Sequence, residues 1–276
     1  MDDSLYDEAR FIIDNYDHPQ PGVYYTLTRV PGKDAPDALF EHFGCGCVCT
    51  NLECNDDVNC SCLKLGPNYR KLDGELVLES DKFGDLPVFE CNLRCRCFEG
   101  VDDVNELRRK CRNRCVQFGP CESLEVFTTT GKGLGVRSTR RIQSGRFICE
   151  YAGEVIGLEE AKIRQARNGA KGQMNYIFIL REHFNDSQVV TCVDPTNIGN
   201  IGRYINHSCR PNSAIVPVRT STFIPLLCIF AIRDIEEGEE ICFDYGSGNG
   251  GIDGENRKPC LCGSEVCKKW LPFQIV

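Results

Sequence analysis

The residues best suited to chemistry in this chain are its 20 cysteines, many of which are spaced like metal ligands. Nine of them form one array, made of Cys47, Cys49, Cys54, Cys60, Cys62, Cys91, Cys95, Cys97 and Cys111. Structural zinc takes four ligands in a tetrahedron, so three ions need about twelve ligand positions. Nine thiolates supply these positions if three sulfurs each bridge two ions. The array therefore predicts a three-zinc cluster.

A second, smaller group of thiolates lies near the end of the chain, at Cys260, Cys262 and Cys267. A structural zinc site needs a fourth ligand, and we expect Cys209 to supply it. Cys209 ends the run Asn206-His207-Ser208-Cys209. A zinc ion held in this way would fold the end of the chain over whatever Asn206 and His207 line, so this ion should be coupled to function.

The remaining cysteines are expected to be packing residues rather than metal ligands, with one alternative at Cys45. Cys45 and Cys115 are spare when the spacing is laid out, and the role of a small buried residue fits both. Cys45 could instead replace Cys47 as the first ligand of the array. Five more stand alone in apolar strand patterns, where core packing is expected: Cys121, Cys149, Cys192, Cys228 and Cys242.

Composition bounds the environment and the partners. The chain has 276 residues, of which 41% are hydrophobic, enough for a sizeable core in one or two domains. Its acidic start lacks a signal-peptide pattern, and no apolar run approaches a membrane span, so we expect reduced, metal-binding thiols and no membrane. The net charge of −8 favours a basic partner over nucleic acid phosphates, although an acidic surface also serves solubility.

The elements that must position these residues follow from the apolar pattern. Residues 1–43 are polar, with one short helix expected around Asp7 to Ile13, and form a wrapping arm. From Leu124 onward, short β-rich runs are expected at Leu124–Thr129, Leu134–Ser138, Arg146–Glu150, Asn175–Arg181, Gln188–Asp194, Ser213–Val218 and Leu226–Ile232. One amphipathic helix, about Leu158 to Ala166, interrupts them. The fold class is mostly β with few helices.

With these residues in hand, the chain resembles the SET-domain lysine methyltransferases of the SUV39 class. Those proteins carry a nine-cysteine pre-SET region, a SET domain and a cysteine-containing post-SET tail. The resemblance spans roughly Tyr24 to Phe273 and is closest to the methyltransferase half of SETMAR-like proteins. It is carried by Phe89-Glu90-Cys91-Asn92, Cys149-Glu150-Tyr151-Ala152-Gly153-Glu154-Val155, Asp194-Pro195-Thr196 and the run from Ile198 to Arg203.

The resemblance implies a division of the chain into four parts. These are the arm (1–43), a pre-SET zinc domain with a triangular three-zinc cluster (44–118), a SET catalytic domain of the β-clip type (119–247) and a zinc-binding post-SET tail (248–276). The segment from Phe98 to Lys110 is longer than usual for the family. We expect it to form a solvated helical loop that leaves the cluster undisturbed.

The resemblance also implies the site residues. Lys132, Gly133 and Leu134 look like the turn that cradles S-adenosylmethionine, and the rest of the cofactor site is implied at Tyr176, Arg203, Asn206 and His207. Tyr245 is similar to the catalytic tyrosine, Phe243 to the residue that tunes how many methyl groups are added, and Tyr176 also faces the reaction. Two positions depart from the family, Leu134 (often tryptophan) and Asn197 (often tyrosine), which could reduce activity.

The activity implied is methyl transfer from S-adenosylmethionine to a lysine of histone H3, with lysine nine favoured and di- or trimethylation expected from Phe243. Lysine thirty-six and non-histone lysines stay open. The implied setting is a nuclear, chromatin-bound monomer that binds the H3 tail or nucleosome without sequence-specific contacts to DNA. Two other classes compete: a catalytically weak zinc-dependent reader of histone tails, and a structural multi-zinc interaction module.

Overall fold

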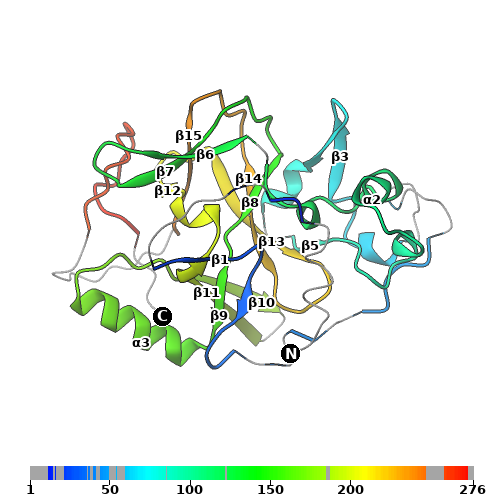
Figure 1. The fold of residues 1–276 in the computed structure, drawn as a ribbon, viewed down its shortest axis with the longest axis horizontal. Coiled ribbons are helices and arrows are strands. Elements are labelled where there is room, and N and C mark those ends of the chain that lie inside the picture. The colour runs from blue at the N-terminus through cyan, green and yellow to red at the C-terminus, as the bar shows by residue number, and fades with distance from the viewer. Residues whose placement is uncertain are drawn as a thin grey trace.

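The fold consists mainly of short β-strands (Figure 1). The computed structural model describes residues 12–14, 16, 22–35, 37, 40–41, 44–49, 54, 60–84, 86–121, 123–184, 187–246 and 258–272. Within them lie two α-helices, α2 (Val104–Lys110) and α3 (Leu158–Ala170), so the predicted mostly-β class is confirmed. Most of the helix expected around Asp7 to Ile13 lies outside the described residues. None of the described helices has the length and apolar character that a membrane crossing requires.

Three sheets form the body of the protein, and each joins strands that are distant in sequence. The first contains β1 (Tyr24–Tyr25), β11 (Ser187–Gly199), β9 (Gly153–Ile156) and β2 (Val30–Pro31), with β10 (Phe178–Phe184) also on β11. The second has the order β12 (Asn206–His207), β15 (Glu240–Phe243), β7 (Leu134–Ser138) and β6 (Leu124–Thr128). The third has the order β5 (Val88–Phe89), β13 (Ser213–Arg219), β14 (Leu226–Ala231) and β8 (Phe147–Glu150).

The smaller elements are a hairpin and several 3-10 turns. The hairpin pairs β3 (Tyr69–Leu72) with β4 (Glu75–Leu78). The 3-10 helices are η3 (Ser61–Leu63), η4 (Ser80–Phe83), η5 (Arg96–Phe98), η6 (Val116–Phe118) and η7 (Ile201–Tyr204). Of these, η7 matters most for function because it directly precedes β12.

The hydrophobic core lies where the sheets meet. Every residue of β14 and β8 is buried, although β8 is the edge strand of its sheet, so other elements cover both strands. β7 has the bounds that the sequence predicts, and β13 and β14 differ from theirs by one residue. The predicted strand at Asn175 begins three residues later, at Phe178, and the predicted helix continues to Ala170. The strands β9 and β15 were not predicted.

The described part of the arm lies along the β domain as extra strands. β1 runs parallel to β11, and β2 runs parallel to β9. Between them, the Thr28 hydroxyl donates to the Glu150 carboxylate at 2.7 Å, and the Arg29 backbone N–H donates to the same carboxylate at 3.1 Å. The Arg29 side chain is 3% exposed and donates to Thr222 Oγ1 and the Ile224 carbonyl. A guanidinium group buried in this way anchors the arm.

Residues 44–118 contain little regular structure, and their most buried side chains include eight of the nine array cysteines. The expected helical loop contains α2, whose first turn is capped by the Asp103 carboxylate accepting from the Glu106 N–H. It is not wholly solvated, however. Leu107 is 1% exposed and packs with Val101 and Phe118. One apolar side chain on the helix therefore fixes this long segment to the rest of the domain.

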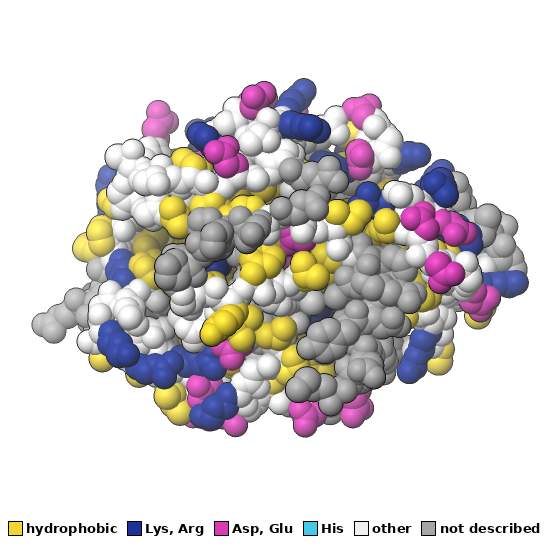
Figure 2. All heavy atoms as spheres, viewed as in Figure 1, with side chains coloured by type: hydrophobic (Ala, Val, Ile, Leu, Met, Phe, Trp, Pro, Cys, Tyr) yellow, Lys and Arg dark blue, Asp and Glu magenta, His cyan; other side chains and the backbone are white. Residues whose placement is uncertain are grey.

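The charged side chains follow no single pattern on the visible surface. Acidic groups are spread over the face shown in Figure 2, while several lysine and arginine side chains gather along its lower left edge, where α3 lies (Figures 1 and 2). On α3, Lys162 and Arg167 are exposed, whereas Arg164 is buried against the carboxylates of Glu154, Glu160 and Asp194. The ion pairs of Arg164 with Glu154 and Asp194 hold α3 on the first sheet.

We expect Arg29→Ala to lower the free energy of unfolding by about 2 to 4 kcal/mol, because it removes the guanidinium donor from the buried Thr222 hydroxyl, leaves the Ile224 carbonyl with only its bond from Thr222, and opens a cavity. Thermal unfolding in zinc-saturated buffer would measure this loss. Arg140→Ala is the matched control, since Arg140 is exposed. An Arg29 variant as stable as that control would show that the arm does not anchor through this side chain.

Candidate active site

The predicted site residues meet where two short strands run side by side. β12 pairs in parallel with β15, so Asn206 lies opposite Cys242 and His207 lies opposite Phe243. The Ser208 N–H continues this pairing by donating to the Phe243 carbonyl at 3.1 Å. Tyr245 follows two residues after β15. Residues almost 40 positions apart in sequence are thereby held in one place.

Tyr245 is fixed at both its backbone and its hydroxyl. Its N–H donates to His207 Nδ1 at 3.2 Å, and its hydroxyl donates to the Ile205 carbonyl at 2.9 Å. Burial raises the pKa of the Tyr245 hydroxyl well above its usual range, and the nearby Tyr176 hydroxyl adds to this shift. The phenol is therefore neutral near pH 7, with oxygen lone pairs still free to accept hydrogen bonds.

Phe243 lies at the centre of an aromatic cluster. Its side chain is 1% exposed, and its ring centroid lies 4.9 Å from that of Tyr245, 5.9 Å from that of Tyr151 and 6.3 Å from that of Phe178. The Tyr151 hydroxyl donates to the Tyr176 carbonyl at 2.6 Å. Tyr151 was not among the predicted site residues. Its presence in the run from Cys149 to Val155 was the signal that could have identified it.

Tyr176 and Arg203 lie together beside this cluster. The Arg203 guanidinium lies 4.7 Å from the centroid of the Tyr176 ring and 4.9 Å from that of Tyr204. Arg203 Nε also donates to the Pro195 carbonyl at 2.9 Å. The guanidinium thus stacks between two aromatic rings, an arrangement that holds the Tyr176 ring in place. The role of both residues in cofactor binding stays a prediction.

The expected cofactor turn contacts Asn206 through a carboxylate. Asn206 Nδ2 donates to the Leu134 carbonyl and to Glu240 Oε1, both at 2.9 Å. Lys132 Nζ lies 2.5 Å from Glu240 Oε2. Glu240 was not predicted, yet it joins the turn to β12.

Gly133 leaves room for a ligand at this turn. It has a φ of 76°, in the left-handed region that favours glycine, and no protein atom lies within 4 Å of the position that a Cβ would occupy. Both features fit a turn whose backbone must approach S-adenosylmethionine closely. Of the two departures from the family, Leu134 packs against the main core and Asn197 is exposed on β11.

The predicted tail metal site is assembled from two distant segments. The sulfurs of Cys209, Cys260, Cys262 and Cys267 all lie within 4.8 Å of one another. Cys209 Sγ is 3.8 Å from Cys260 Sγ. Four thiolates around a tetrahedral zinc with bonds of about 2.3 Å have sulfurs about 3.8 Å apart, whereas a disulfide would place two of them about 2.05 Å apart. The donor set therefore fits zinc.

The nine array cysteines also come together, in overlapping sets of four. One set joins Cys47, Cys49, Cys54 and Cys60, and another joins Cys54, Cys91, Cys97 and Cys111. The two cysteines left over, Cys62 and Cys95, lie 3.6 Å apart, and each belongs to a further set that also contains Cys47 and Cys91. Cys47 and Cys91 each belong to three of these four sets and Cys54 belongs to two, and such sharing fits three zinc ions joined by bridging thiolates.

Arg114 supplies positive charge next to this cluster. Three zinc ions and nine thiolates leave the cluster negative overall. The Arg114 side chain is fully buried, and Nη2 lies 3.9 Å from Cys97 Sγ. Although burial alone would lower it, the pKa of Arg114 is raised by the surrounding cysteine thiolates. Cysteine spacing alone did not predict this role.

The spare cysteines differ from expectation in one case. Cys45 is exposed and belongs to none of the sulfur sets among the described residues, whereas Cys47 is 1% exposed. Cys47 is therefore the first ligand of the array, and the suggestion that Cys45 is a small buried residue is wrong. Cys115 is partly buried. Of the five predicted core cysteines, all but the partly buried Cys121 are fully buried.

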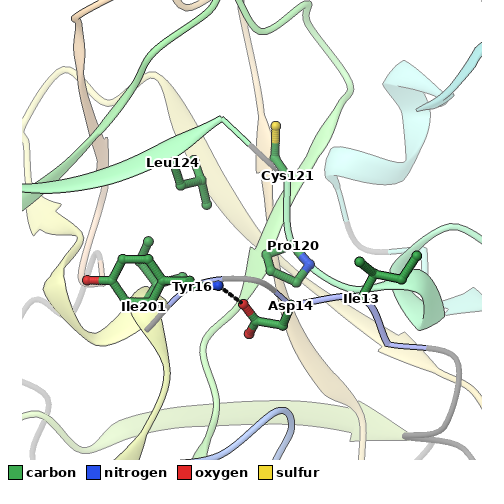
Figure 3. Close-up of a pocket in the computed structure, with 7 residues that line it drawn as sticks. All are labelled: Ile13, Asp14, Tyr16, Pro120, Cys121, Leu124 and Ile201. Carbon is green, nitrogen blue, oxygen red and sulfur yellow. Dashed lines mark hydrogen bonds between the residues drawn. The ribbon is translucent and has the colours of Figure 1, made fainter. Parts of the chain in front are cut away.

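A separate cavity of about 120 Å³ lies between the arm and the start of the β domain (Figure 3). It is lined by Ile13, Asp14, Tyr16, Pro120, Cys121, Leu124 and Ile201. The Asp14 carboxylate accepts from the Tyr16 N–H at 3.0 Å. No predicted catalytic or cofactor residue lines this cavity, so it is distinct from the site described above.

Mild chelation should remove the tail metal first and abolish activity before the β domain unfolds, because this site is closed by three ligands from a short tail. Zinc release, activity and circular dichroism would be followed in one titration. Cys267→Ser should reproduce the loss, whereas Cys45→Ser, outside both clusters, should behave as wild type. Activity that outlasts release of the tail metal would contradict this coupling.

Comparison with known proteins places these features in a family. The family model described as SET domain matches residues 133–246. The chain is 43% identical over 248 residues to the probable histone-lysine N-methyltransferase set-23 of Caenorhabditis elegans. The aligned region covers 89% of this chain and 95% of the relative.

Solved structures agree. The crystal structure of the methyltransferase domain of human SETMAR superposes with a TM-score of 0.77 at 40% identity, covering 95% of this chain and 93% of that one. The structure of KRYPTONITE with DNA, an H3(1–15) peptide and SAH gives a TM-score of 0.70 at 30% identity, covering 92% of this chain and 48% of that one. Given this identity over most of its length and the shared fold, the chain belongs to the SET-domain family of S-adenosylmethionine-dependent protein-lysine methyltransferases.

Proposed function

We propose that this protein methylates histone H3 in chromatin, with lysine nine as the favoured target and two or three methyl groups added. The relatives support a histone substrate, since set-23 is named a probable histone-lysine N-methyltransferase. The KRYPTONITE structure holds an H3 peptide of residues 1–15, a span that includes position nine. Lysine thirty-six of H3 is the second candidate, because the preference of SETMAR-like proteins leaves it open.

The observation that carries the proposal is the aromatic cluster of Tyr151, Phe178, Phe243 and Tyr245 beside the expected cofactor turn. Aromatic faces receive the hydrocarbon stem of lysine and tolerate the cationic or methylated amine at its end. A basic histone tail also suits a protein with a net charge of −8. The arrangement supports a lysine-binding site at this cluster.

The chemistry requires a neutral amine, because only the free lone pair attacks a methyl group. A lysine side chain has a pKa of about 10.4 in water and is almost fully protonated near pH 7. Desolvation among aromatic rings disfavours the ammonium form and lowers that pKa. Bound S-adenosylmethionine supplies a methyl group activated by a positive sulfur. The lysine ammonium would first lose a proton to water; its nitrogen would then form the new N–C bond as the C–S bond breaks, and the sulfur would leave as a neutral thioether.

Tyr245 orients the reacting groups rather than removing the proton. Its pKa is raised by burial, so a tyrosinate base is disfavoured near pH 7. The phenol oxygen is held by the hydrogen bond to the Ile205 carbonyl and presents its lone pairs in a fixed direction. Such a preorganised oxygen stabilises partial positive charge on the methyl group in transit and restrains the amine.

The proposal is tested by methylation of H3 tail peptides and nucleosomes with lysine nine, lysine thirty-six or both replaced by arginine. We expect loss of transfer when lysine nine is replaced. Tyr245→Phe should lower kcat about 100-fold or more while S-adenosylmethionine still binds, since it removes only one preorganised group. Radiolabel transfer measures kcat, and calorimetry measures cofactor binding.

Three results would contradict the proposal. Transfer that depends on lysine thirty-six alone would correct the target. Peptide binding without any transfer would favour a histone-tail reader, and failure to bind the cofactor would favour a structural zinc module. Near-normal turnover by Tyr245→Phe would instead remove the role assigned to that tyrosine.

Product multiplicity follows from Phe243. This buried ring has no hydroxyl to hold a water molecule in the space that a methylated amine needs. We expect the wild-type protein to add two or three methyl groups and Phe243→Tyr to stop mainly after one. Mass spectrometry of the peptide product over time would distinguish them. A strictly monomethylated product from the wild-type protein would rule out the role given to Phe243.

A further inference from the structure

We propose that the His207 imidazole is a positioning group that couples the tail metal site to the catalytic tyrosine. Its Nε2–H donates to the Cys209 thiolate, and its Nδ1 accepts the Tyr245 backbone N–H. This role belongs to the side chain and is separate from any contact that residues 206–207 make with the cofactor. It rests on the proposed function only in taking Tyr245 as catalytic.

The geometry places one ring nitrogen at each partner. His207 Nε2 lies 3.3 Å from Cys209 Sγ, and Nδ1 lies 3.2 Å from the Tyr245 backbone nitrogen. The side chain is 2% exposed, so water does not compete for either nitrogen. The ring also packs against Tyr245, with 5.4 Å between centroids. A single buried imidazole therefore connects Cys209, an expected metal ligand, to the backbone of Tyr245.

These partners determine the tautomer. A backbone N–H can only donate, so Nδ1 must carry a lone pair where it meets Tyr245. The proton of a neutral imidazole then lies on Nε2, where it points at Cys209 Sγ. A zinc-bound thiolate is a better acceptor than a thiol because it carries negative charge. Binding of the tail metal thus strengthens the hydrogen bond that orients the ring.

Cys209 has a second donor, which comes from the tail itself. The Lys268 backbone N–H lies 3.4 Å from Cys209 Sγ. The thiolate is therefore held from the β domain by His207 and from the tail by Lys268. Hydrogen bonds to a ligand atom fix its direction and tune its affinity for the metal, and their loss commonly costs about 10-fold to 100-fold in affinity or activity.

The pairing of strands explains why the ring can transmit this effect. His207 lies opposite Phe243 in the β12–β15 ladder, and the ladder ends with the Ser208 N–H on the Phe243 carbonyl. After Phe243 the backbone pairing stops, and the Tyr245 N–H donates instead to the His207 side chain. If the ring turns, the backbone that carries the catalytic hydroxyl loses this restraint.

Two amide substitutions separate the two halves of the proposal. Asn places its side-chain oxygen near the position of Nδ1 but does not reach Cys209, whereas Gln places its amide nitrogen near the position of Nε2 and leaves Nδ1 without an equivalent. We expect His207→Asn to weaken retention of one zinc ion about 10-fold, as for other groups that support a metal ligand. We expect His207→Gln to retain zinc and to lose mainly kcat.

The readouts do not depend on activity alone. A chromophoric chelator would count the zinc ions released and the concentration needed for each. Trp270, the one tryptophan of the chain, lies in the tail, where its backbone pairs with that of Pro259 in an antiparallel β-bridge. Its fluorescence therefore reports the state of the tail. Cys209→Ser serves as the reference for loss of the tail site. Retention of the other three zinc ions shows that the rest of the protein has folded.

The proposal stands if zinc retention and kcat separate between the two variants as described. It is overturned if both variants lose zinc and kcat to the same extent, since that pattern indicates only a damaged fold. It is equally overturned if His207→Asn keeps wild-type zinc retention and tail fluorescence. Zinc release and fluorescence can be measured without any substrate, so an error in the target lysine would leave this test unaffected.

Discussion

Thiolate–metal bonds are the constraint on which the two ends of this structure depend. In the array and in the tail site, cysteine sulfurs lie 3.6 to 4.0 Å apart. At these distances, buried thiolates repel one another unless a cation lies between them. The β domain has its own core of apolar strands, whereas residues 44–118 gather eight buried cysteines into a separate cluster and the tail brings three cysteines to Cys209. Their folding is therefore linked to metal binding.

The two metal regions are connected to the β domain in different ways. The array reaches it through the Glu90 backbone N–H, which donates to the Arg219 carbonyl of β13, while the Glu90 carboxylate accepts from Tyr69, Gln117 and two backbone N–H groups within residues 44–118. That carboxylate lies beside Cys91, and β5 also pairs with β13, so these contacts fix a rigid scaffold at a distance from the aromatic cluster. The tail instead connects through Cys209, two residues from His207. The array therefore supports the fold, whereas we propose that the tail completes the site.

Local sequence patterns predicted the parts of the site that are encoded locally. Cysteine spacing identified both zinc regions, and strands such as β7 and β13 followed from short β-rich runs separated by turn residues. Glu240 and Tyr151 were missed for a physical reason. Glu240 acts through partners 108 and 34 positions away, Lys132 and Asn206, and a polar residue at the start of a strand has no distinguishing pattern. Tyr151 follows a fully buried strand and is indistinguishable from core by composition alone.

The placement of the site on the boundary between these regions follows from what the reaction needs. Methyl transfer requires alignment within a fraction of an ångström, which paired strands provide for Phe243 and His207. It also requires that water be kept from the amine and yet that substrate enter and product leave. A site enclosed wholly by the β core would meet the first requirement and fail the second. A tail with little apolar core, held by four thiolates, can enclose the site without being part of the core that aligns it.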